Sequence, residues 1–236
     1  MKVSVVIPVY NEEKRIEQTA EVLDSYLKGI ADEYQIVFSN DGSLDSTFAL
    51  AKALDAKYPS VKAVGYDVNR GKGCAVRHGI LASDGDVVLF TDCDLAYGTE
   101  VIKKALDRFE ETGADIVIGS RNLDAESYSG YSFIRKLMSK VYFKIISLAS
   151  GFKHTDSQCG FKCFKKEAAH TIFSECVIDS FAFDLEALIK AEKKGYTVAE
   201  IPVKIINHDD GTSKVRIVRD TLKMLKDIRN IRKMNK

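Results

Sequence analysis

The sequence lacks tryptophan, has only three prolines, and has no apolar run near the ~20 residues of a membrane-spanning helix. It begins on a strand-like segment without the features of a secretory leader, so we expect a chain that is soluble or lies on a membrane surface. The net charge of +1 over 236 residues argues for no particular partner, and we expect no nucleic-acid binding. The remaining composition is that of an ordinary globular protein.

Paired metal-binding cysteines are also lacking. The five cysteines form an odd set, and Cys159 and Cys163 lie four residues apart with no second pair and no histidine doublet nearby. This usage indicates reduced thiols in or near the core of a cytoplasmic protein, rather than disulfides or a zinc site.

Apolar strand-like segments alternate with amphipathic helix-like segments over the first ~120 residues, which predicts an α/β fold with βαβ units and a mostly parallel sheet. We expect Asn11 to cap the first helix, with Glu12 and Glu13 in its first turn. Further along, the pattern predicts helices near 166–174 and 182–194 and a short strand pair near 197–207. The strands expected in the first part are 3–9, 35–39, 61–66, 87–91 and 115–119.

Polar side chains follow the first four predicted strands. In parallel sheets, ligands bind outside the carboxyl ends of the strands, so these residues should share one edge. We therefore expect a ligand site built from Asn11, Asp41, Asn69 with Lys72, and Asp92 with Asp94.

Two of these residues form an Asp-x-Asp pair directly after the apolar segment 87–91. Alternate residues of an extended chain point to the same side, so Asp92 and Asp94 should project together. Two close carboxylates repel unless a cation lies between them, and hard divalent ions prefer oxygen ligands. The sequence thus predicts an Mg²⁺ or Mn²⁺ site; the alternative is a strand that ends in a solvated acidic turn.

Two familiar nucleotide motifs are missing. Gly71-Lys72-Gly73 is not a phosphate loop of the GxxxxGK[ST] type, because Gly73 stands where a magnesium-binding Ser or Thr is needed. No GxGxxG follows the first strand, which excludes a dinucleotide fingerprint there.

Two segments combine apolar and basic residues. Segment 131–149 predicts an amphipathic helix that packs on the domain or rests on a membrane interface. Segment 215–234 predicts a second, basic amphipathic helix, either packed on this chain or a second subunit, or anchored to an anionic bilayer.

The motifs resemble those of family 2 glycosyltransferases of the GT-A fold, and specifically the polyprenyl-phosphate branch with the dolichyl-phosphate mannose and glucose synthases. They occur in family order over essentially the whole chain. The resemblance implies a single glycosyltransferase domain, 1–236, with a nucleotide-sugar-binding half 1–122, an acceptor half 123–207, and a Ser-Lys loop and C-terminal helix 208–236. The matching residues are Val6–Glu13, Asn40-Asp41-Gly42-Ser43, Asn69-x-Gly71-Lys72-Gly73, Asp92-Cys93-Asp94, Gly119-Ser120-Arg121, Asp156–Lys162, Phe183-Asp184-x-Glu186 and Gly211–Lys214.

The resemblance assigns donor-binding roles. Asp41 would accept hydrogen bonds from the nucleobase, and Asp92 and Asp94 would hold Mg²⁺ or Mn²⁺ against the diphosphate of the donor. The nucleotide-sugar-binding residues implied are Pro8, Tyr10, Asn11, Glu12, Asp41, Ser43, Lys72, Asp92 and Ser213.

It also assigns acceptor and catalytic roles. Arg121 and Arg135 would surround the acceptor phosphate, and Lys214 with Ser213 would close over the donor phosphates. Asp184 stands where relatives with hydroxyl acceptors place a base, and here is either a base or an orienting residue. Arg135 could instead be a solvated helix residue, and Lys162 and Glu186 packing partners. The acceptor-binding residues implied are Arg121, Arg135, Gln158 and Lys162.

Two departures from the mannose synthase pattern favour glucose over mannose, and UDP-glucose over GDP-mannose. Ala96 stands where a glutamine often helps hold the metal, and His208 where an arginine often precedes the Ser-Lys loop. We therefore predict an inverting transfer of a hexose to polyprenyl phosphate by a protein peripheral at the cytoplasmic face of a membrane. The partners expected include a second copy of the chain in a homo-oligomer. The alternatives are transfer to a hydroxyl of a cell-surface glycan, and a non-catalytic nucleotide-sugar-binding protein.

Overall fold

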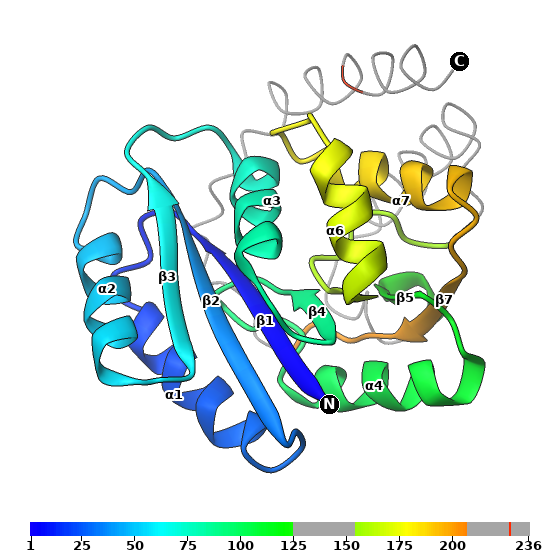
Figure 1. Cartoon of the computed structure of the whole chain (residues 1–236), viewed down its shortest axis with the longest axis horizontal. Coiled ribbons are helices and arrows are strands. Elements are labelled where there is room, and N and C mark those ends of the chain that lie inside the picture. Colours follow the sequence, from blue (N-terminus) through cyan, green and yellow to red (C-terminus); the bar gives the residue numbers. More distant parts are fainter. Residues whose placement is uncertain (125–153, 207–226, 228–236) are drawn as a thin grey trace, which may run out of the picture.

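The structure is a computed structural model that describes residues 1–124, 154–206 and 227 (Figure 1). Its centre is a seven-stranded sheet in the order β3-β2-β1-β4-β6-β5-β7. The sheet is parallel except for β6, which runs antiparallel to both β4 and β5. This confirms the predicted α/β fold. The strands are β1 Lys2–Val9, β2 Glu33–Asp41, β3 Val61–Tyr66, β4 Val87–Phe90, β5 Ile116–Ser120, β6 Lys162–Lys165 and β7 Val198–Pro202.

Helices cover both faces of the sheet (Figure 1). Side chains alternate along each strand, so Val5 and Ile7 of β1 join one core cluster while Val6 joins the other. The first cluster packs α1, α2 and α4 on one face, and the second packs α3, α6 and α7 on the opposite face. The helices are α1 Ile16–Leu27, α2 Thr47–Lys57, α3 Lys72–Ala82, α4 Glu100–Thr112, α6 Lys166–Glu175 and α7 Phe183–Lys193, with a 3-10 turn at Arg121–Leu123.

The predicted helix cap at Asn11 is wrong. Helix α1 begins at Ile16, five residues later, with Arg15 preceding it. Asn11 adopts a left-handed backbone conformation with φ 54°, which asparagine tolerates better than most residues. Its backbone N–H donates to Ser43 Oγ, and its side-chain oxygen accepts from the Leu44 N–H. Asn11 therefore joins the loop after β2 instead of the helix.

Of the strand pair predicted near 197–207, one strand, β7, forms, and the described residues 203–206 form no second one. Strand β7 pairs in parallel with β5. Beyond Pro202, the Val203 N–H donates to Ser120 O and the Ile206 N–H to Ala96 O, so the chain crosses the end of the sheet instead of turning back.

The five cysteines are free and buried, as the sequence predicted. Among the residues that the structure describes, no helix is long and apolar enough to cross a membrane. Segments 131–149 and 215–234, and with them the predicted amphipathic helices, lie outside the described residues apart from Asp227. Asp227 accepts a hydrogen bond from Ser180 Oγ at 2.6 Å.

Candidate active site

The carboxyl ends of β1, β2 and β4 meet at one edge of the sheet, as expected. Asp92 follows β4, and its carboxylate is paired with the ammonium of Lys72 at 2.5 Å. Lys72 is the first residue of α3, and the preceding Gly71 has φ +119°, a conformation that favours glycine. The positive end of the α3 dipole and the Lys72 charge therefore both lie at the Asp92 carboxylate, an arrangement suited to anions.

Nearby carboxylates keep Lys72 charged. Burial alone would lower the pKa of Lys72, but the charges of Asp92, Asp184 and Asp94 overcome it and raise that pKa above its usual value. The side chain therefore remains a cation that can be shared between the carboxylates and a bound phosphate.

The Asp-x-Asp pair has the character of a cation site. Burial and the neighbouring charge of Asp92 raise the pKa of Asp94, although the Ala96 N–H donates to it. Two neighbouring carboxylates, one of them largely buried, are an oxygen donor set that fits Mg²⁺ or Mn²⁺. No group of three or more His, Cys, Asp or Glu residues suited to a metal occurs in the described part of the chain.

A second ion pair lies beneath this edge. Lys162, at the start of β6, is fully buried and donates to Asp184 Oδ1 at 2.6 Å and to Cys159 O at 2.7 Å. Burial raises the pKa of Asp184, and the charges of Lys162 and Lys72 offset only part of that rise. Whether Asp184 acts as a base or as an orienting residue stays a prediction. The predicted contact of Lys162 with the acceptor stays a prediction.

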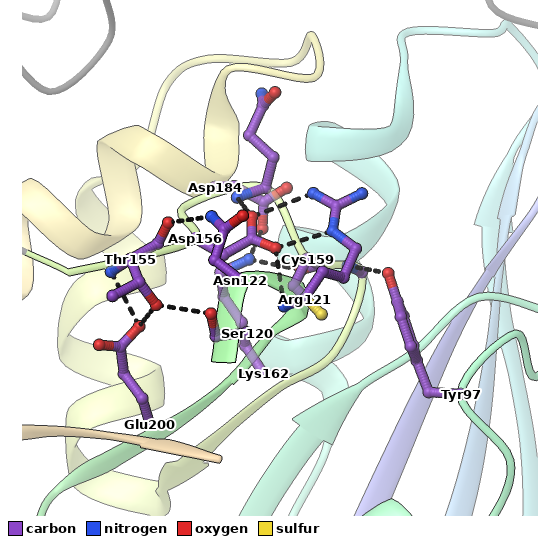
Figure 2. Close-up of polar contacts among 12 residues, drawn as sticks. Tyr97, Ser120, Arg121, Asn122, Thr155, Asp156, Cys159, Lys162, Asp184 and Glu200 are labelled. Atoms are coloured by element: carbon purple, nitrogen blue, oxygen red, sulfur yellow. Dashed lines mark hydrogen bonds and ion pairs between the residues drawn. The ribbon is translucent and has the colours of Figure 1, made fainter. Parts of the chain in front are cut away.

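Arg121 lies at the end of β5 and is held by Asp156 (Figure 2). Its Nε and Nη2 donate to the two carboxylate oxygens of Asp156 at 2.7 and 3.0 Å, a bidentate pair. Asp156 is fully buried and also accepts from the backbone N–H groups of Arg121 and Gln158. The pair holds the pKa of Arg121 well above its usual value despite burial, so the guanidinium is permanently charged.

The segment that carries Asp156 is fastened on both sides. Thr155 donates through its N–H and hydroxyl to Glu200 of β7, and its hydroxyl is hydrogen-bonded to Ser120 at the end of β5 (Figure 2). Asn122 Nδ2 donates to Thr155 O at 2.6 Å. These contacts give Arg121 and Asp156 a fixed position.

The same segment reaches the Asp-x-Asp pair. A Cβ atom on Gly160 would lie 2.4 Å from Asp92 Oδ2, so the Gly160 backbone packs directly on that carboxylate. The Gly160 N–H points to Tyr97 Oη at 3.4 Å, and Tyr97 lies across from Arg121 (Figure 2). Segment 154–162 therefore joins Arg121, Asp92 and Asp184 into one site.

Asp41 is almost fully buried, and its carboxylate binds the turn that leads to α3. It accepts from the Tyr66 hydroxyl, from Asn69 Nδ2, and from the Arg70 and Gly71 N–H groups at 2.8 to 3.0 Å. A carboxylate offers about four lone-pair sites, and these four donors fill them. The structure thus assigns Asp41 to holding the loop, and its predicted contact with a nucleobase stays a prediction.

The other predicted donor residues lie at the ends of β1 and β2. The Glu12 N–H donates to Thr47 Oγ1 at 2.7 Å, which ties the loop after β1 to the start of α2. Pro8 and Tyr10 also belong to this group, as do Asn11 and Ser43, whose contacts are given above. The contacts of these residues do not test their predicted roles in binding the donor. Arg135, Ser213 and Lys214 lie outside the described residues.

Sequence reasoning gave no role to Asp156, Gly160 or Tyr97. The available signal for Asp156 and Gly160 was their place in the matching motif Asp156–Lys162. Tyr97 had no such signal, and its contact with Gly160, like that of Gly160 with Asp92, spans 60 to 70 residues.

Comparison with known proteins agrees with this geometry. The family model described as "Glycosyl transferase family 2" matches residues 4–173. The chain is 33% identical over 241 residues to a dolichyl-phosphate beta-glucosyltransferase of Dictyostelium discoideum, covering 97% of this chain and 73% of that protein. It is 34% identical over 218 residues to a dolichol-phosphate mannosyltransferase of Pyrococcus furiosus, covering 92% of this chain but 60% of that protein.

The fold is also similar to that of a solved structure. Glucosyl-3-phosphoglycerate synthase from Mycobacterium tuberculosis, in complex with Mn²⁺, UDP-glucose and phosphoglyceric acid, superposes with a TM-score of 0.69 at 18% identity, covering 98% of this chain and 79% of that chain. At this identity the likeness shows the fold alone. Together with the matching family model and the relatives above, the site geometry leads to one conclusion: the chain belongs to glycosyl transferase family 2.

Proposed function

We propose that the chain transfers glucose from UDP-glucose to a dolichyl-type polyprenyl phosphate, in a single displacement that inverts the anomeric centre. The observation that carries the proposal is the position of segment 154–162. This segment holds Arg121 through Asp156 and packs Gly160 against Asp92, so one short segment contacts both the arginine and the first carboxylate of the Asp-x-Asp pair.

On the donor side, Lys72 and the N-terminus of α3 would bind the diphosphate, and Asp92 and Asp94 would hold Mg²⁺ or Mn²⁺. A divalent ion bound there supplies Lewis-acid stabilisation of the leaving nucleoside diphosphate. Lys72 exchanges its contact with Asp92 for one with the phosphate oxygens. Its positive charge and the N-terminus of α3 stabilise the negative charge that grows as the bond to the sugar breaks. Ser213 and Lys214 complete this side in the proposal.

On the acceptor side, the lipid phosphate is largely ionised near neutral pH and needs no general base. The main obstacle is repulsion between two polyanions. The fixed guanidinium of Arg121, with Arg135 beside it in the proposal, lowers that repulsion and orients the phosphate oxygens for attack. Gln158 and Lys162 belong to the same acceptor half, 123–207.

The identity of the sugar is supported by the relatives. The Dictyostelium protein is named a dolichyl-phosphate beta-glucosyltransferase and the Pyrococcus protein a dolichol-phosphate mannosyltransferase. The chain spans 73% of the length of the Dictyostelium protein and 60% of that of the Pyrococcus protein. Glucose also agrees with Ala96 and His208, and mannose from GDP-mannose is the second candidate.

The acceptor is a lipid, so the protein must reach a membrane. In the proposal it is peripheral at the cytoplasmic face and makes contact through segments 131–149 and 215–234. Segment 215–236 holds eight Lys or Arg and two Asp, a net basic charge that suits anionic lipids. The alternative for segment 215–234 is that it joins two copies of the chain instead of binding a membrane.

A panel of UDP- and GDP-sugars with a short polyprenyl phosphate, with and without Mn²⁺, tests the function. Metal-dependent glucosyl transfer from UDP-glucose is the expected result. Transfer to a free saccharide, but not to the lipid phosphate, would establish the hydroxyl acceptor instead. In that case Asp184→Asn should abolish activity and Arg135→Ala should matter little, whereas a lipid-phosphate acceptor makes Arg135→Ala the severe change.

A further inference from the structure

The loop between α6 and α7, residues 176–182, lies against the first turn of α3. The Gly73 N–H donates to Asp179 O at 2.9 Å. A Cβ atom on Gly71 would lie 2.4 Å from Asp179 O, and one on Gly73 would lie 2.5 Å from Ile178 O. The two backbones therefore pack together with no room for a side chain between them.

An ion pair joins the loop to the same helix. Arg77 Nη2 lies 2.7 Å from Asp179 Oδ1, with both side chains partly buried. The first N–H groups of a helix have no partner inside the helix, and no side chain caps α3. The Asp179 carbonyl accepts from one of these groups, the Gly73 N–H. The loop thus fixes the turn from which Lys72 extends towards Asp92.

Glu186 holds this loop from the other side. It lies on α7, is fully buried, and accepts from the Val177 N–H at 3.0 and 3.1 Å and from the Ile178 N–H at 2.8 Å. Lys190, one turn later, lies 3.8 Å from it. The Glu186 charge is therefore used to bind backbone amides of the loop.

We propose that Glu186 is a positioning residue for donor binding. It fixes loop 176–182, the loop fixes the turn at Gly71–Gly73, and the turn directs Lys72 to the diphosphate. The inference rests on the proposed function for the identity of the donor. Since small shifts of a binding group are costly, loosening the loop should weaken donor binding while the acceptor side, held by Asp156 and Glu200, stays in place.

Glu186→Gln tests this, because it keeps the side-chain volume and replaces one acceptor oxygen with an amide that faces backbone N–H groups. We expect the Kd for UDP with Mn²⁺ and the KM for UDP-glucose to rise about tenfold, as when an outer-shell partner is lost. The KM for polyprenyl phosphate should not change. Glu192→Gln is the matched control: it lies on the same helix, and its carboxylate faces His154 at 3.6 Å.

Backbone amide exchange at residues 71–77 gives a readout that needs no nucleotide. It should speed up in Glu186→Gln and stay unchanged in Glu192→Gln. If Glu186→Gln does not fold, Asp179→Asn decides, because it removes the ion pair with Arg77 from a partly exposed position and keeps the carbonyl. Unchanged donor binding in a folded variant, or equal rises in donor and acceptor KM, would overturn the proposal. If the wild-type chain transfers no sugar to lipid phosphate, the proposed function fails, and nucleotide affinity and amide exchange still decide this inference.

Discussion

Replacing Asp156 with asparagine removes the negative partner of Arg121. The Asp156 side chain is fully buried and that of Arg121 is about one quarter exposed, so the guanidinium would lose its partner in a largely buried place. The carboxylate accepts two bonds from the guanidinium and two from backbone N–H groups, and an amide oxygen replaces only part of these. Breaking a buried ion pair costs 3–5 kcal/mol, and the partial exposure of Arg121 puts this one at about 3 kcal/mol. For a chain of this size, that corresponds to a fall in Tm of about 6–12 °C.

The assay is thermal and urea unfolding of wild type and Asp156→Asn between pH 7 and pH 2. Burial tends to raise the pKa of Asp156, but the hydrogen bonds and charge of Arg121 outweigh it and hold that pKa below its usual value. A carboxyl with a lowered folded-state pKa stabilises the fold above its unfolded pKa, about 3.9, and loses that contribution as the pH falls through the folded value. The difference in the free energy of unfolding between wild type and Asp156→Asn should therefore be largest at pH 7 and shrink below about pH 4.

Asp107→Asn is the control, because Asp107 forms an exposed i,i+4 pair with Lys103 on α4. Pairs of this kind are worth about 0.3–0.5 kcal/mol, and the variant should melt close to wild type. A Tm for Asp156→Asn equal to that of Asp107→Asn, or a gap that does not depend on pH, would refute the reasoning.

Three further predictions concern the same site. In Gly160→Ala the new methyl group displaces the Asp92 carboxylate, which lies 2.4 Å from the Cβ position, so affinity for UDP with Mn²⁺ should fall about tenfold in calorimetry with little change in Tm. Gly29→Ala, where the nearest atom is at 3.4 Å, should bind like wild type, and equal affinities in the two would contradict the contact. Lys162→Met leaves Asp184 buried without its partner and should lower the free energy of unfolding in urea by about 3–5 kcal/mol. The double variant Lys162→Met with Asp184→Leu should recover most of this loss. A double variant as unstable as Lys162→Met alone would argue against the ion pair as the cause. Chelation of the metal should stop transfer without changing Tm. Mn²⁺ should raise Tm only when UDP is present, and at 100 times Kd the bound ligand should add about 2.7 kcal/mol to the free energy of unfolding. Stabilisation by Mn²⁺ alone would show that the protein provides more ligands than the Asp92–Asp94 pair.

Local patterns were enough to predict most of the fold. The strand expected over 61–66 forms as Val61–Tyr66, and the helix expected near 166–174 forms as Lys166–Glu175. The misses came where local signals compete with tertiary contacts. Asn11 has the residue type of a helix cap, but hydrogen bonds with Ser43 and Leu44 draw it into another loop. Near 203–206, bonds to Ser120 and Ala96 replace a return strand.

The sequence by itself determined which residues follow each parallel strand, and so which side chains share the edge of the sheet. That follows from chemistry that is local: the period of an apolar pattern and the i, i+2 spacing of Asp92 and Asp94. The tertiary structure decided how the two halves of the site meet. Strand β6 enters antiparallel between β4 and β5, with Lys162 opposite Phe90, and this register places Lys162 against Asp184 and Gly160 against Asp92. No local pattern encodes these contacts, because they depend on strand order and register across 22 to 68 residues of chain.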